Sequence, residues 1–140
     1  MAYWLMKTEP DVFSWDDLVA RGAAGEPWDG VRNYQARNNM RAMQLGEQAF
    51  FYHSRGSAPA VVGLCEVIAT AHPDPTTDDP RWECVDVRAL RPLARPVTLA
   101  AIKAEPALAE MVLVRNSRLS VQPVREAEWR HICAMGGLTP

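Results

Sequence analysis

Aromatic side chains stand beside amide, hydroxyl and charged side chains in three short segments of the sequence. A pocket for an extruded or single-stranded base needs flat faces for stacking, worth roughly 1–3 kcal/mol per base. It also needs donors and acceptors for the edge of the base. The three segments could supply both, through Trp4, Trp28, Tyr34, Tyr52 and His53 together with Lys7, Thr8, Glu9, Arg32, Asn33, Arg37 and Asn38.

Some of these aromatic residues have a second interpretation as core residues. Trp4, Phe50 and Phe51 lie in apolar runs and are expected in the core. Trp28 and Tyr52 have polar, turn-forming neighbours, so a pocket role and a core role both stay open. The arginines have an alternative as solvated surface residues, which applies to Arg32, Arg37, Arg41, Arg115 and Arg118.

No enzyme motif accompanies these segments. A phosphate-binding glycine loop, HExxH and GxSxG are all absent from the sequence. Each of the three cysteines lies in an apolar pattern that is typical of a buried thiol. Glu9, Asp29 and His53 are the candidates for an acid–base set, which depends on geometry that the sequence does not give. We therefore predict no catalytic residue.

Length and composition indicate one globular domain over residues 1–140. Fifteen basic and seventeen acidic residues give a formal charge of −2, so any nucleic-acid contact must come from a local patch. Cys65, Cys84 and Cys133 are far apart and lack metal-binding spacing, so we predict no metal, no cofactor and a cytoplasmic protein. No apolar run approaches the roughly 20 residues of a membrane span.

Hydrophobic patterning and turn residues predict an α+β domain with a small barrel-like sheet. Helices are expected from Ser14 to about Gly22 and over residues 33–43, 98–103, 106–111 and 125–135. Loops are predicted over residues 21–25, 54–59 and 72–80, and a connection with a short edge strand over residues 92–99. Strands are expected over residues 3–7, 48–53, 60–71, 81–90 and 119–124, with Gly63 marking a bulge or a close approach.

Six stretches along the chain carry a family resemblance. They are YWLMKTEP (3–10), WDGVRNYQARN (28–38), FFYHS (50–54), AHPDPT (71–76), MVLVR (111–115) and RLSVQPV (118–124). They occur in family order through nearly the whole chain, and the second and the last are long and unusual. On these residues the chain resembles the EVE domain family of the PUA-like superfamily.

The resemblance implies a PUA-like pseudo-barrel of five to six strands flanked by short helices, similar to the YTH domain that reads methylated adenine in RNA. It implies a non-catalytic reader that holds an extruded modified base, such as a modified cytosine, from DNA or RNA. The base and the type of nucleic acid stay open, and a monomer is assumed. The implied pocket consists of Lys7, Thr8, Glu9, Trp28, Asn33, Tyr34, Tyr52, His53 and Ser54. The implied rim or backbone contacts are Arg32, Arg37, Asn38, Arg118 and Ser120.

The chain departs from the family pattern at two places. Thr8 stands where many relatives have Ser, and the loop after Thr76 is short. Two other functions stay open: a hydrolase similar to ASCH proteins that uses Glu9 and His53, and an interaction domain that binds a small ligand. For a reader, a Trp28→Ala substitution is expected to remove base discrimination and to leave the fold intact.

Overall fold

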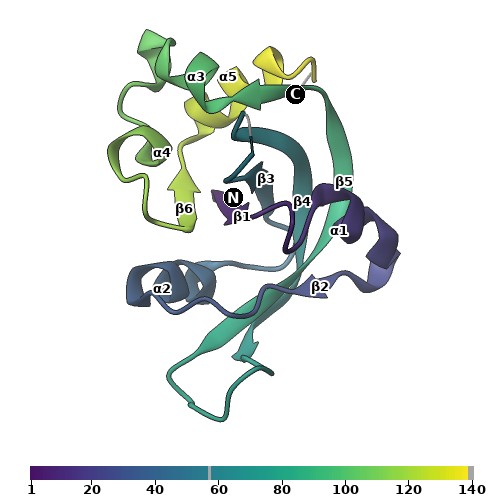
Figure 1. The fold of residues 1–140 in the computed structure, drawn as a ribbon. Coiled ribbons are helices and arrows are strands. Elements are labelled where there is room, and N and C mark those ends of the chain that lie inside the picture. The colour runs from purple at the N-terminus through teal and green to yellow at the C-terminus, as the bar shows by residue number, and fades with distance from the viewer. Residues whose placement is uncertain (57, 139–140) are drawn as a thin grey trace.

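One six-stranded sheet organises the chain, with the strands in the order β2–β5–β4–β3–β1–β6 (Figure 1). This is a computed structural model, and it describes residues 1–56 and 58–138. The order confirms the prediction of five to six strands flanked by short helices. The strands are β1 (Tyr3–Thr8), β2 (Glu26–Pro27), β3 (Gln48–His53), β4 (Ala60–Pro73), β5 (Glu83–Thr98) and β6 (Val121–Val124).

The central strands separate two apolar clusters. Successive side chains of a strand point to opposite faces. On β3, Phe51 therefore joins one cluster and Phe50 the other. On β1, Trp4 and Leu5 divide in the same way. Because both faces are covered, Trp4, Phe50 and Phe51 are buried, as predicted.

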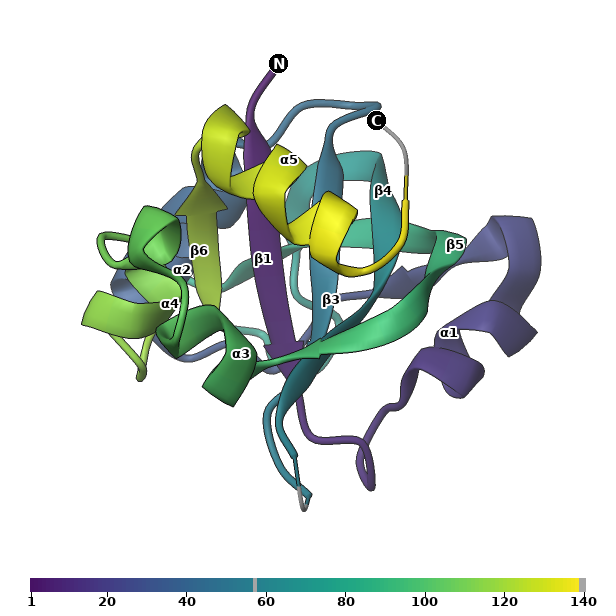
Figure 2. The ribbon, with the colours of Figure 1, turned by 90° about the horizontal axis from the view of Figure 1, so that it is seen from above.

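Different helices cover the two faces. The helices are α1 (Trp15–Arg21), α2 (Tyr34–Ala42), α3 (Leu99–Lys103), α4 (Val112–Arg115) and α5 (Glu126–Met135). Seen from above, α5 lies over β1 and β3, where Trp129 stacks on Phe50 with ring centroids 3.9 Å apart (Figure 2). α1 and α2 contribute Leu18 and Met40 to the other cluster. That cluster lies beneath the candidate site.

The predicted helix starts are largely confirmed. Ser14 caps α1 in a capping box with Asp17, and Asn33 caps α2 by accepting from the Ala36 N–H. Two expectations were wrong: the predicted loop at 21–25 contains a 3₁₀ turn (Gly22–Ala24), and the predicted helix 106–111 is only a 3₁₀ turn (Pro106–Leu108). Two elements, β2 and α4, were missed.

β4 and β5 are longer than the sequence predicted. β4 continues through His72 and Pro73, which were expected in a loop, and β5 continues through the supposed connection at 92–99. Four register shifts between these strands explain the difference, because bulges let a long hairpin bend while it stays paired. Pro92 lies opposite Gly63 beside one such shift, where a strand tolerates proline.

Cys65, Cys84 and Cys133 are free and buried, as their apolar neighbours predicted. Burial raises the pKa of the Cys65 thiol to about 12. Within residues 1–56 and 58–138, no helix is long and apolar enough to cross a membrane. The cytoplasmic location stays a prediction.

Candidate functional site

A pocket of about 470 Å³ opens where the end of β1 meets the loop between β2 and α2. Its volume falls within the range of small-molecule sites. Apolar and charged side chains share the lining, which consists of Lys7, Thr8, Val12, Phe13, Arg21, Glu26, Pro27, Trp28, Asp29, Gly30, Val31, Arg32 and Ser120.

Trp28 forms an aromatic wall of this pocket and also belongs to the core. Its backbone N–H donates to the carbonyl of Val85 at 2.8 Å, which fixes the residue at the end of β2. Its indole meets Phe51 and Phe13 edge-on, at centroid distances of 5.6 and 6.4 Å. Only 7% of Trp28 is exposed. Trp28 therefore both lines the pocket and packs in the core.

The loop that carries Trp28 is held by Asp74, a buried carboxylate from the loop after β4. One oxygen accepts from the backbone N–H of Gly30 at 2.9 Å and from Arg32 at 3.0 Å. The other accepts from the backbone N–H and the hydroxyl of Thr76. Gly30 has a φ of +77°, which favours glycine. Burial acts to raise the pKa of Asp74, but these hydrogen bonds outweigh it and lower that pKa to about 2.

Lys7 and Thr8 supply polar groups from the end of β1. The Lys7 amine donates to the carbonyl of Ser117 at 2.6 Å, and burial lowers the pKa of this amine. The Thr8 hydroxyl donates to the carbonyl of Phe13 at 3.0 Å. Thr8 thus ties the loop after β1 to the pocket, and Lys7 provides a cation at its edge.

Asp29 adds an acceptor to the exposed rim. Partial desolvation and the nearby carboxylates of Asp74 and Glu26 raise the pKa of Asp29, against the opposing effect of Arg32. The sequence placed Asp29 among acid–base candidates, and the structure places it on the wall of the pocket. A carboxylate here could accept hydrogen bonds from an amino group on the edge of a base.

A second hollow adjoins the pocket and shares Lys7, Thr8 and Ser120 with it. There Arg55 forms an ion pair with Glu9 at 2.9 Å. Its remaining lining residues are Ser54, Ser117 and Arg118. Of the predicted site residues, the pocket and this hollow together contain Lys7, Thr8, Glu9, Trp28, Arg32, Ser54, Arg118 and Ser120.

The other predicted pocket residues have different positions. Asn33 caps α2, and Tyr34 is half exposed beside Trp82. Tyr52 is buried in the cluster beneath α5, with the Lys7 amine 5.8 Å from its ring centroid. Nε2 of His53 accepts from the backbone N–H of Trp15 at 3.1 Å.

The predicted rim residues Arg37 and Asn38 lie on α2, where the Asn38 side chain accepts from Arg37. Neither residue lines the pocket or the adjoining hollow as the structure describes them.

Other lining residues were missed in the sequence. Phe13 is preceded by a turn and stands alone as an apolar residue before Ser14, and Arg21, which ends α1, fell in the segment predicted as a loop. Glu26 and Pro27 form β2, which is too short to have a hydrophobic period. The one signal for this stretch was its position directly before the motif at 28–38.

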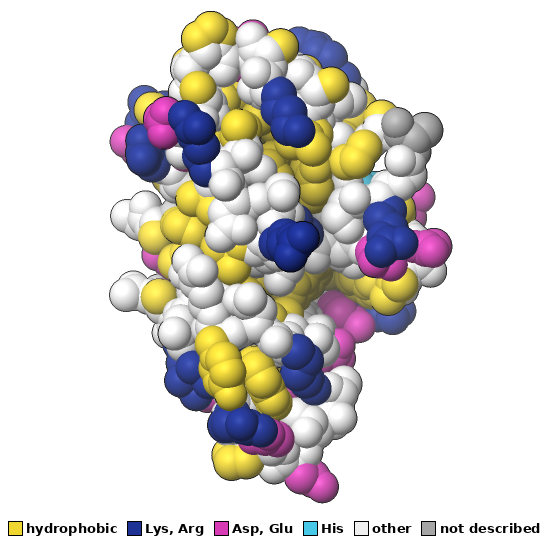
Figure 3. Space-filling model, turned by 60° about the vertical axis from the view of Figure 1, so that its left-hand side comes forward, with side chains coloured by type: hydrophobic (Ala, Val, Ile, Leu, Met, Phe, Trp, Pro, Cys, Tyr) yellow, Lys and Arg dark blue, Asp and Glu magenta, His cyan; other side chains and the backbone are white. Residues whose placement is uncertain are grey.

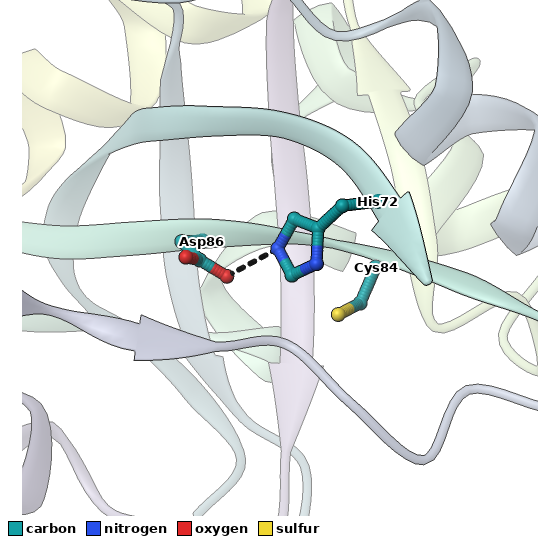
Figure 4. A group of neighbouring side chains, drawn as sticks. All are labelled: His72, Cys84 and Asp86. Atoms are coloured by element: carbon teal, nitrogen blue, oxygen red, sulfur yellow. Dashed lines mark hydrogen bonds and ion pairs between the residues drawn. The ribbon is translucent and has the colours of Figure 1, made fainter. Parts of the chain in front are cut away.

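His72, Cys84 and Asp86 lie together on β4 and β5, with their potential ligand atoms within 4.8 Å of one another (Figure 4). These are atom types that bind Zn²⁺. The spacing of Cys and His in the sequence could not reveal this group, because strand pairing places His72 opposite Cys84. A contact of 2.7 Å between Nε2 of His72 and Asp86 accounts for the arrangement without a metal. The absence of a metal stays a prediction.

Comparison with known proteins gives a consistent result. The family model described as "EVE domain" matches residues 2–135. Protein Atu2648 from Agrobacterium tumefaciens has a crystal structure that superposes with a TM-score of 0.96 and 53% identity, covering 99% of this chain and 94% of the other.

Human thymocyte nuclear protein 1 is 39% identical over 96% of this chain and 73% of its own length. Its crystal structure in complex with DNA containing 5-methylcytosine has a TM-score of 0.91 at 37% identity and covers both chains fully. A YTH domain from Zygosaccharomyces rouxii, solved with N6-methyladenosine RNA, has a TM-score of 0.57 at 16% identity over 99% of this chain and 86% of the other. This last similarity concerns the fold alone.

Proposed function

The chain belongs to the EVE domain family, and on that premise we propose that it is a non-catalytic reader of a modified nucleobase. One observation carries the proposal: the pocket combines the aromatic wall of Trp28 and Phe13 with the polar groups of Lys7, Thr8 and Asp29. Stacking and edge hydrogen bonds are the two needs of an extruded base. The complex of human thymocyte nuclear protein 1 with 5-methylcytosine DNA supports this use of the fold.

We propose modified cytosine in DNA as the first ligand to test. Cytosine presents an amino group, for which Asp29 and Glu26 are acceptors, and a carbonyl, for which the Lys7 amine is a donor. The apolar side chains of Val12 and Val31 also line the pocket and offer contacts to a methyl group. Lys7, Thr8 and Trp28 are the proposed base contacts retained from the sequence, with Arg32, Arg118 and Ser120 at the rim. Glu9 and Ser54, which were predicted as base contacts, line the adjoining hollow instead.

The hydrolase alternative receives little support from the contacts of its two residues. Nε2 of His53 already accepts a backbone hydrogen bond, so this atom is not free to accept a proton from a substrate. Burial also lowers the pKa of His53, and Glu9 pairs with Arg55. Turnover of oligonucleotides that is lost in Glu9→Gln or His53→Ala would favour the hydrolase over the reader.

The test is a binding titration with short DNA and RNA strands, single and duplex, each with and without one modified base, at low and moderate salt. We expect a preference for a modified strand that Trp28→Leu reduces. Trp129→Leu is the matched control, because Trp129 is buried to the same extent (6% exposed) on the other face of the sheet. Equal binding of modified and unmodified strands by the wild type would contradict the proposal.

A further inference from the structure

Two stacked aromatic rings lie between two guanidiniums beside the pocket. The rings of Tyr34, at the start of α2, and Trp82, just before β5, stack with centroids 5.0 Å apart and planes 25° apart. The guanidinium of Arg32 lies over Trp82 at 5.4 Å, and that of Arg37 lies over Tyr34 at 4.8 Å. We call these four residues the Arg–aromatic stack. Sequence analysis did not single out Trp82.

The stack is fixed in place although it faces water. Tyr34 is 50% exposed. Arg81 donates to the Tyr34 hydroxyl at 3.3 Å, and Arg37 donates to the carbonyl of Arg81 at 3.0 Å. These contacts join α2 to the loop before β5. In Figure 3, hydrophobic side chains lie between Lys and Arg side chains at this lower end of the molecule, where Figure 1 places α2 and the loop between β4 and β5.

The charge of the stack is only partly neutralised. Arg32 pairs with the buried carboxylate of Asp74, and Arg81 pairs with Asp79. Arg37 instead bonds the side-chain oxygen of Asn38 and the carbonyl of Arg81, and it has no carboxylate partner within the described ranges. Tyr34 is half exposed and Trp82 is half-buried, and the guanidiniums of Arg37 and Arg32 cover the outer faces of these two rings. A guanidinium can bind a phosphate and can also stack on a base, so the Arg–aromatic stack offers both kinds of contact to a nucleic-acid strand.

The position of the stack suggests which part of a strand it meets. Arg32 lines the pocket and also lies over Trp82, so the stack continues the wall of the pocket outward. A strand with one nucleotide extruded into the pocket must leave along the surface beside it. The stack would then face the neighbouring nucleotides, whose stacking the extrusion has disturbed.

We propose that the Arg–aromatic stack is a second contact with nucleic acid, which binds the nucleotides next to the extruded base. This proposal rests on the proposed function. The stack supplies affinity for the strand and no discrimination between modified and unmodified bases. Tyr34 and Arg37, which lie outside the pocket, would then contact the neighbouring nucleotides and not the extruded base.

The test measures affinity and discrimination separately, with modified and unmodified strands of DNA and RNA. We expect Trp82→Ala and Tyr34→Ala to weaken binding of both strands by the same factor, about 5- to 150-fold for one lost stacking contact. Trp82→Phe, which keeps a ring, should retain most of the affinity. We expect Arg37→Gln to reduce the slope of log K against log salt by about 0.9 on duplex or about 0.7 on a single strand.

Two control variants remove similar groups elsewhere. Tyr3→Ala opens another stacked pair, Tyr3 with Trp129 (centroids 4.5 Å apart), and Arg130→Gln removes an exposed arginine from α5. Neither should change binding. Thermal unfolding of each variant separates loss of contact from loss of fold.

The outcomes distinguish this inference from the proposed function. If the wild type discriminates but the Trp82 and Tyr34 variants bind like the wild type, the stack is not a contact and the reader stands. If the wild type binds all strands equally and these variants bind weakly, the stack is a contact and the reader fails. A loss of discrimination in the Trp82 variant, like that expected for Trp28→Leu, would place the stack in the base pocket and overturn the inference. No binding by the wild type would overturn both.

Discussion

The indole of Trp28 meets the ring of Phe51 almost at a right angle, with centroids 5.6 Å apart. A single residue thus joins the pocket wall to the core. Truncation of a buried Trp to Ala costs about 3–5 kcal/mol. We therefore expect Trp28→Ala to lower the free energy of unfolding by about that amount, which replaces the expectation that it leaves the fold intact. Urea unfolding checks this, and a loss below about 1 kcal/mol would contradict it.

Gly63 in β4 leaves room for Trp15 of α1. A Cβ added to Gly63 would lie 2.6 Å from atoms of the Trp15 ring, closer than any real contact. We expect Gly63→Ala to destabilise the protein by about 1–3 kcal/mol, as overpacking does. Thermal unfolding measures the effect.

The double variant provides the control for this contact. Trp15→Leu removes the ring that the new Cβ would meet, so the cost of Gly63→Ala should fall in that background. An equal cost in both backgrounds would mean that the strand geometry, and not the Trp15 ring, requires glycine.

Local signals in the sequence predicted much of this fold. Ser14 and Asn33 cap helices where their side chains and neighbours indicated. The long strands were harder, because Pro73 and Pro92 normally end a strand, and the bulges that accommodate them arise from pairing between distant residues. The site divided in the same way. Eight predicted residues line the pocket or the adjoining hollow, whereas Asn33, Tyr34, Tyr52 and His53, which lie in the same motifs, do not. No local signal paired Arg32 with Asp74, 42 residues away.

Addition of Zn²⁺ would show whether His72, Cys84 and Asp86 bind a metal ion. Burial and the surrounding carboxylates raise the pKa of the Cys84 thiol to about 12, so the thiolate that binds metal is costly to form. We expect the same Tm with Zn²⁺ as with a chelator. A rise of several degrees with Zn²⁺ that disappears in Cys84→Ser, but not in Cys133→Ser, would instead identify a metal site.

Asp74 links the stability of the pocket to pH. Its pKa is lowered from the ordinary 3.8 to about 2 in the folded protein. The stability that it contributes is therefore complete above about pH 4 and is lost as the pH falls toward 2. The shift corresponds to roughly 2 kcal/mol at neutral pH. We expect Asp74→Asn to lower the free energy of unfolding by about that amount at pH 7, and by less at pH 3.

The partly exposed Asp79 supplies the comparison for Asp74. Its pKa is also lowered to about 2, first by its hydrogen bonds with Arg81, but salt and water screen this pair. Asp79→Asn should therefore change stability less than Asp74→Asn in urea titrations at each pH. Asp74 also holds Gly30 and Arg32 at the pocket. We therefore expect Asp74→Asn to weaken binding of a modified base and Asp79→Asn to leave it unchanged. A cost of Asp74→Asn that is the same at pH 7 and pH 3 would show that its carboxylate is not the group that fixes this loop.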